Sequence, residues 1–142
     1  MRPTLSFVFF SALFMAMLNP VQAGFKTDTN LPPPEEWAQV DLANWKTPSA
    51  GEMMGLFQPL FGGYAEFDGA KTMTISVNET PDGTAYEVFV TQTGYGDDSV
   101  SGGRWAATVK PQGSGWVIEA LWRQQLCARG ARKDKWTKQN CP

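Results

Sequence analysis

The chain has 142 residues, of which 12 are Lys or Arg and 14 are Asp or Glu, so its formal net charge is −2. A slightly negative chain is a poor partner for nucleic acid, because affinity for nucleic acid depends on clustered positive charge. With 2 Cys and no His, the sequence lacks both the ligands of an ordinary zinc site and a histidine base, and we expect no metal and no other cofactor.

Residues 1–23 are typical of an export signal. Arg2 supplies the positive start, and the apolar run from Leu5 to Leu18 is shorter than the roughly 20 residues that span a bilayer. The sequence that ends at Ala23 fits a cleavage site. We therefore expect an exported chain of about 120 residues that begins at Gly24 and meets the membrane only through the signal peptide before cleavage.

The mature chain is expected to consist of an extended, proline-rich arm over residues 24–34 and a single domain over residues 35–142. Pro34, followed by two glutamates, predicts a short helix at the start of this domain. A second helix is predicted from the capping box of Ser49 and Glu52. Its apolar face has helical spacing, and Pro59 kinks or ends it. The residues of this face are Met53, Leu56, Phe57 and Leu60.

From Tyr64 onward the apolar pattern changes from helical to alternating, which predicts β-strands. Four segments alternate, and turn residues such as Thr80-Pro81-Asp82-Gly83 separate them. They are Thr72–Asn78, Tyr86–Val90, Arg104–Val109 and Trp116–Leu126. Short connections of this kind predict an antiparallel meander.

The last of these strands is the longest, and period-two counting predicts one buried face. Trp116, Ile118, Ala120, Trp122 and Leu126 fall on that face, with Gln124 as its only polar member. The other face is mixed and is expected to be half-solvated. A helix before a four-stranded meander predicts an α+β fold with the helix packed on the sheet, in a cystatin-like or nuclear-transport-factor-like arrangement. A small all-β barrel is the alternative.

The two cysteines, Cys127 and Cys141, allow a single intramolecular pairing, and export favours a disulfide between them. This bridge closes a basic loop. From Arg123 onward six residues are basic and one is acidic, whereas residues 24–122 hold five basic and thirteen acidic residues. The basic residues are Arg123, Arg129, Arg132, Lys133, Lys135 and Lys138. They either dock on the acidic body or bind an anionic partner such as an envelope polymer.

The connection 93–102 between the second and third strands is longer than a hairpin requires and contains Asp97 and Asp98. A calcium loop and a catalytic carboxylate pair are the functional interpretations, but the calcium-loop spacing is missing. A structural turn is favoured, in which one Asp caps amides or pairs with Arg104 or Arg123. These four residues, together with Arg129, Arg132, Lys133 and Lys135, form the candidate binding surface, and no catalytic residue is assigned.

Five aromatic residues outside the last strand are assigned to the core, with a sugar-stacking face as the alternative. They are Trp37, Trp45, Tyr95, Trp105 and Trp136.

The order of motifs from Asp97 to the C-terminus is similar to that of a family of uncharacterised exported bacterial proteins. The motifs are Asp97-Asp98-Ser99-Val100, Gly103-Arg104-Trp105, Trp116, Cys127-Ala128-Arg129-Gly130, Trp136 and Cys141-Pro142. The resemblance covers about the last fifty residues. It implies a location in the bacterial envelope, such as the periplasm, and a disulfide, but no activity.

The favoured hypothesis is therefore an exported, non-enzymatic binding or structural domain. One alternative is an inhibitor whose acidic body binds a cationic envelope enzyme such as a lysozyme. The other is a small hydrolase that uses Asp97, Asp98 or Glu119.

Overall fold

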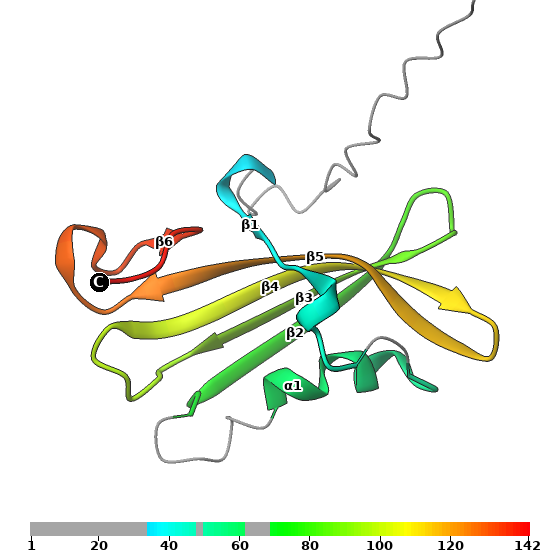
Figure 1. Ribbon diagram of the computed structural model, residues 1–142, viewed down its shortest axis with the longest axis horizontal. Coiled ribbons are helices and arrows are strands. Elements are labelled where there is room, and N and C mark those ends of the chain that lie inside the picture. The colour runs from blue at the N-terminus through cyan, green and yellow to red at the C-terminus, as the bar shows by residue number, and fades with distance from the viewer. Residues whose placement is uncertain (1–33, 48–49, 62–68) are drawn as a thin grey trace, which may run out of the picture.

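The structure is a computed structural model that describes residues 34–47, 50–61 and 69–142. Within these ranges the chain forms a six-stranded antiparallel sheet in the order β1-β5-β4-β3-β2, and β6 also pairs with β5 (Figure 1). The predicted signal peptide 1–23 and the arm, except for Pro34, lie outside the described residues.

Four long strands and two very short ones make up the sheet. Their bounds are β1 (Ala38–Gln39), β2 (Thr72–Glu79), β3 (Tyr86–Thr93), β4 (Val100–Gln112), β5 (Gly115–Cys127) and β6 (Trp136–Thr137). The helical segments are η1 (Pro34–Glu36), η2 (Leu42–Asn44), η3 (Met53–Phe57), α1 (Gln58–Phe61) and η4 (Gly130–Arg132). The strand segments expected from the alternating pattern are found in β2 to β5.

The predicted α+β fold, with a helix across a four-stranded meander, is wrong. Where the amphipathic helix was expected, the chain forms a five-residue 3₁₀ turn followed by a four-residue α-helix. Glu52 precedes this turn but makes no side-chain cap, and its expected partner Ser49 lies outside the described residues. Pro59, which lacks an amide donor, is tolerated only because it stands in the first turn of α1. The segment from Pro34 also forms a single 3₁₀ turn rather than a helix.

The alternative fold, a closed all-β barrel, is wrong as well. In the described part of the chain, β1 and β2 lie at opposite ends of the strand order and do not pair with each other. The sheet is therefore open. Two of its strands, β1 and β6, pair end to end along the same edge of β5, at Trp122–Arg123 and at Gln125–Leu126.

A β-bulge interrupts β5 at Glu119. Thr108 of β4 pairs with Ala120, and the next residue, Val109, pairs with Ile118, so Glu119 has no partner in β4. Successive side chains along a strand point to opposite faces, and an extra residue reverses this assignment on one side of the bulge.

The prediction that Trp116, Ile118 and Trp122 share one buried face of β5 is therefore wrong. Trp116 and Ile118 share a face with Leu121, on the far side of the bulge, and all three pack in one hydrophobic cluster. Trp122 belongs to a second cluster on the opposite face. The strand thus places one tryptophan on each side of the sheet.

The main core lies on the side that η3 and α1 cover, which we call the helix face. Leu56, Phe57 and Leu60 from these turns are buried against the sheet. The sheet contributes Val88, Val90, Ala107, Val109, Ile118 and Leu121. Trp45 lies at the edge of this core and donates its indole N–H to the backbone oxygen of Leu56 at 2.9 Å.

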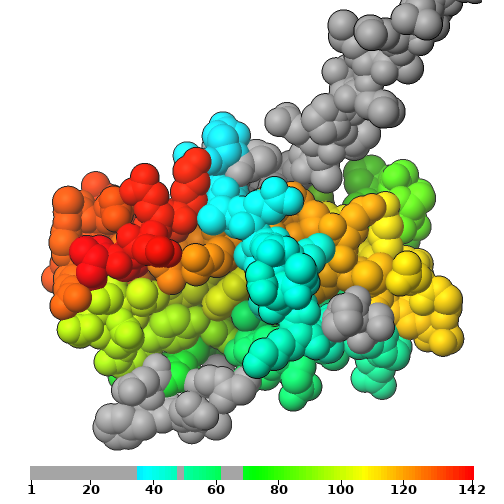
Figure 2. Space-filling model, in the orientation of Figure 1, coloured from blue at the N-terminus to red at the C-terminus, as the bar shows by residue number. Residues whose placement is uncertain are grey.

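The opposite side, which we call the outer face, is covered by the two ends of the described chain. Trp37, only 5% exposed, packs with Phe89, Ala106 and Trp122 in a smaller cluster. Figure 2 shows the C-terminal residues, in red, against the segment that starts at residue 34, in cyan. The outer face is therefore assembled from residues far apart in the sequence.

Candidate functional site

Arg104 of β4 is held between two indole rings on the outer face. Its guanidinium carbon lies 5.1 Å from the ring centroid of Trp37 and 4.6 Å from that of Trp136. Both distances are within the roughly 6 Å at which a cation interacts favourably with an aromatic face. Trp37 follows η1 and Trp136 belongs to β6, so the two ends of the described chain meet at one side chain of the central sheet. We call Arg104, Trp37, Trp136 and Gln124 the arginine clamp.

Gln124 fixes the orientation of the guanidinium. Nε of Arg104 donates to Oε1 of Gln124 at 2.6 Å, and Nε2 of Gln124 donates to the backbone oxygen of Glu36 at 2.7 Å. Because Gln124 is only 1% exposed, these bonds satisfy an amide that burial would otherwise destabilise. Within the described part of the chain, no hydrogen bond is found for Nη1 or Nη2 of Arg104. These two terminal nitrogens of the guanidinium therefore remain available to donate hydrogen bonds to a ligand.

The charge of Arg104 is partly desolvated. Burial lowers the pKa of Arg104 to about 10, and the nearby charge of Glu36 acts in the opposite direction. The side chain remains protonated at neutral pH. Arg104 is half-buried, so its charge has lost part of its contact with water. A bound anion would compensate by accepting charge-assisted hydrogen bonds from the terminal nitrogens of the guanidinium.

The C-terminal loop brings Trp136 to the clamp. Cys127 and Cys141 form the predicted disulfide, with a Cα–Cα distance of 5.3 Å. Between them β6 pairs Trp136 with Leu126 of β5. Asp134 turns the chain back with a φ of 59°, and its amide donates to the backbone oxygen of Cys127 at 2.8 Å. The disulfide therefore joins the two ends of the loop, and backbone hydrogen bonds to β5 hold its middle.

The two adjacent carboxylates of the connection 93–102 point to different partners. Asp97 accepts hydrogen bonds from the amides of Val100 and Ser99, at 2.8 and 2.6 Å, and these bonds lower its pKa. Asp98 forms an exposed ion pair with Arg129 at 3.0 Å. A general acid needs a raised pKa, so the lowered value makes Asp97 unsuited to that role.

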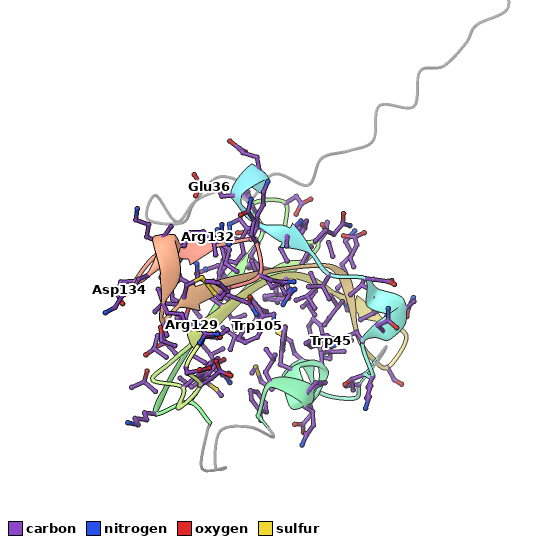
Figure 3. All side chains as sticks on the ribbon, turned by 60° about the vertical axis from the view of Figure 1, so that its left-hand side comes forward. Glu36, Trp45, Trp105, Arg129, Arg132 and Asp134 are labelled. Carbon is purple, nitrogen blue, oxygen red and sulfur yellow. A yellow bond between two sulfur atoms is a disulfide. The ribbon has the colours of Figure 1, made fainter. Side chains whose placement is uncertain are left out.

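The residues of the predicted basic surface differ in their hydrogen-bond partners. Arg132 works inside the loop, where its two terminal nitrogens donate to Oε1 of Gln139 and the backbone oxygen of Asn140. Arg123 lies on the helix-face side of β5 and reaches Asn140 at 3.3 Å. Lys133 and Lys135 are exposed, and within the described residues the side-chain ammonium group of neither has an ion-pair or hydrogen-bond partner, although their backbone groups bond within the loop. Figure 3 shows Arg129, Arg132 and Asp134 gathered around the C-terminal loop, with Trp45 well away from it.

A shallow depression of about 270 Å³ lies on the helix face beside α1. In it, Tyr95 donates to Oε1 of Gln92 at 2.7 Å, and Nε2 of Gln92 donates to the backbone oxygen of Leu60 at 2.7 Å. Burial raises the pKa of Tyr95 to about 12, so its phenol is neutral. These polar groups already bind one another, which leaves the arginine clamp as the stronger candidate site.

Sequence reasoning missed how the clamp is built. Arg104 was a candidate, but Trp37 and Trp136 were assigned to the core or to a sugar-stacking face, and Gln124 only to a buried strand position. The usable signal was Gln124, because a buried amide in a strand requires partners. Nothing local to the sequence identifies Arg104 as that partner.

Among the residues that the structure describes, no three His, Cys, Asp or Glu side chains are grouped closely enough to hold a metal ion. None of the helices in the same ranges is long and apolar enough to span a bilayer. Comparison with known protein families, with curated proteins and with solved structures finds no match to this chain.

Proposed function

We propose that this chain is an exported, non-enzymatic binding domain that takes an anionic polymer of the bacterial envelope at the arginine clamp. The observation that carries the proposal is the guanidinium of Arg104, held between two indoles, with no hydrogen bond found for Nη1 or Nη2 among the described residues. A planar fork of this kind matches the two oxygens of a carboxylate or phosphate group.

The surrounding charge supports an anionic ligand. Residues 123–142 hold six basic side chains and one acidic side chain. Four of the six, Arg123, Arg129, Arg132 and Lys138, donate hydrogen bonds to residues of the described chain. Lys133 and Lys135 remain for a ligand, and exposed charges of this kind act over about a Debye length of roughly 8–10 Å.

Export is supported by the signal-like residues 1–23 and by the disulfide, since disulfides persist in oxidising compartments. Cleavage after Ala23 would start the mature chain at Gly24. N-terminal sequencing of protein recovered from outside the cytoplasm tests this part of the proposal. A chain that keeps residues 1–23 would contradict it.

Binding is tested with two model polyanions, inorganic polyphosphate and polygalacturonate, which separate phosphate from carboxylate recognition. The intrinsic fluorescence of the clamp tryptophans reports occupancy. Wild-type protein should bind one of them at low salt, with an affinity that falls as salt rises. Arg104→Met keeps an apolar stem between the indoles but removes the charge. Because a hydrogen bond to a charged group contributes about 1.5–3 kcal/mol, we expect at least a tenfold loss of affinity.

Lys46→Met is the matched control, because it removes one positive charge from an exposed side chain outside the C-terminal loop. It should bind like wild type. Replacing Lys133 and Lys135 by Gln should weaken binding less than Arg104→Met does. Arg132 is unsuitable for this test, because its hydrogen bonds hold the loop together. Equal binding by wild type and Arg104→Met, with both folded, would overturn the proposal.

The carboxylates of the hydrolase alternative all have partners. Asp97 caps two amides, Asp98 pairs with Arg129, and Glu119 pairs with Lys110 at 2.6 Å. An acid–base pair would need two carboxylates aimed at a common substrate position. The binding function is therefore the one that the geometry supports best.

A further inference from the structure

The strand β2 forms one edge of the sheet and has features of a pairing surface. Within the described residues it pairs only with β3, over eight residues and without a register shift. Ile75 and Val77, which are 38% and 44% exposed, are the large hydrophobic side chains left exposed in the described part of the chain. Both belong to β2 and point to the helix-face side.

Within the described residues, this edge lacks the features that usually prevent edge-to-edge pairing. Such features include proline, lysine within the strand, bulges and a covering segment. From Thr72 to Glu79 the strand has no proline and no lysine, and its only charged residue is Glu79 at the end. Lys71 stands immediately before the strand.

The backbone of β2 directs the N–H and C=O groups of alternate residues toward the open edge of the sheet. The amide of Thr80 donates to the backbone oxygen of Ala85, which continues the β2–β3 ladder by one bonded pair. Because bonded and non-bonded pairs alternate, the even-numbered residues of β2 bond to β3. The N–H and C=O groups of Met73, Ile75 and Val77 therefore face the open edge.

The sequence of this edge is complementary to itself. In an antiparallel pair centred on Ile75, Ile75 faces the same residue of the second copy and Met73 faces Val77. At both ends Lys71 of one copy stands opposite Glu79 of the other. Met73, Ile75, Val77 and Glu79 alternate onto one face of β2, and Lys71 occupies the position immediately before the strand that stands opposite Glu79 of the second copy. Within the described residues neither Lys71 nor Glu79 has an ion-pair partner. Registers shifted by two or more residues lose both charge pairs.

We infer that β2 pairs with β2 of a second copy of this chain, so that two sheets join into one continuous sheet across a two-fold axis at Ile75. The occupant of the edge is a second copy because charge, apolar pattern and backbone direction all match under a two-fold operation. This inference is independent of the arginine clamp, which lies around β5 on the outer face.

Sedimentation of the full mature chain over a range of concentrations tests the inference, and we expect a monomer–dimer equilibrium. Lys71→Glu and Glu79→Lys each create two like-charge pairs and should each weaken the dimer at least about tenfold. The double variant restores the two ion pairs and should recover the dimer. An equimolar mixture of the two single variants should form a heterodimer, since every charge pair is then attractive.

A cysteine at position 75 tests the register. In a hydrogen-bonded antiparallel pair the Cα atoms are about 5.5 Å apart, within reach of a disulfide, so Ile75→Cys should cross-link two chains. Ser76→Cys, whose side chain points to the other face and lies off the axis, is the matched control and should not. A monomer at every concentration would overturn the inference, and so would a dimer that the charge variants leave unchanged.

Discussion

Deletion of Glu119 tests whether the bulge in β5 determines the two faces of the sheet. Without this residue, the side chains on one side of the bulge must point to the opposite faces of the sheet. Residues 115–118 are the shorter of the two sides. Reversing them removes Trp116 and Ile118 from the helix face and places Val117 there instead. Ile118 is 5% exposed, and full burial of such a side chain stabilises a fold by about 1.5–3 kcal/mol. With part of Trp116 lost as well, we expect the free energy of unfolding to fall by at least about 2 kcal/mol.

The control is Glu119→Ala, which keeps the bulge and removes only an ion pair with Lys110. The two side chains of this pair are 48% and 41% exposed, and exposed pairs contribute about 0–1 kcal/mol. Urea unfolding followed by tryptophan fluorescence gives the free energy of unfolding of both variants. If the deletion lowers it no more than the substitution does, Glu119 is not the residue that reverses the faces.

Four further outcomes are expected. Replacing both Cys127 and Cys141 by Ser opens a loop with a sequence separation of 14 residues and should lower the free energy of unfolding by about 3 kcal/mol, measured in urea. Gly103→Ala would place a Cβ 2.5 Å from the indole of its neighbour Trp105, and the same measurement should show a loss of about 1–3 kcal/mol. Burial raises the pKa of Tyr95 from 10.0 to about 12, so the contribution of this phenol to stability is complete below pH 10 and is lost between pH 10 and about 12. An absorbance titration of tyrosinate should show one phenol that ionises near the raised pKa in the wild type and is absent from Tyr95→Phe. Amide hydrogen bonds lower the pKa of Asp97 below 3.8, so its contribution is present above pH 3.8 and is lost as the pH falls through the lowered value; Asp97→Asn should remove this acid dependence of unfolding.

The long strands were predictable because their patterns are local. Met73, Ile75 and Val77 alternate with polar residues, and no competing helical pattern covers that segment. The helix was overestimated for a similar reason. The spacing from Met53 to Leu60 fits a helical face, and three of its four residues are buried, but with Pro59 and flanking glycines the segment forms only short turns.

The faces of β5 could not be predicted, because a bulge is a property of two strands together. Nothing near Glu119 in the sequence differs from an ordinary exposed strand position, and only the pairing with β4 leaves it without a partner. The strands β1 and β6 escaped notice because two residues cannot show a period. Both exist because β5 extends a free edge beside them.

Near the candidate site, the disulfide could be predicted from the number of cysteines, since two cysteines allow only one pair. The arginine clamp needed coordinates. Arg104, Trp37 and Trp136 are separated by more than thirty residues at each step, and no periodicity relates them. The buried amide of Gln124 was the one available indication, because it requires a hydrogen-bond partner, but it named neither Arg104 nor the two tryptophans.

The clamp also explains why a domain with so few helical residues closes its outer face. Trp37 and Trp136 come from opposite ends of the described chain, and each packs on Arg104, whose Nε is fixed by the buried Gln124. The first end is also bonded to the last, because Lys138 donates to the backbone oxygen of Glu35 at 2.6 Å. Loss of the disulfide would therefore free Trp136 and expose one side of the guanidinium. The same bridge that stabilises the fold thus maintains the geometry on which the proposed anion site depends.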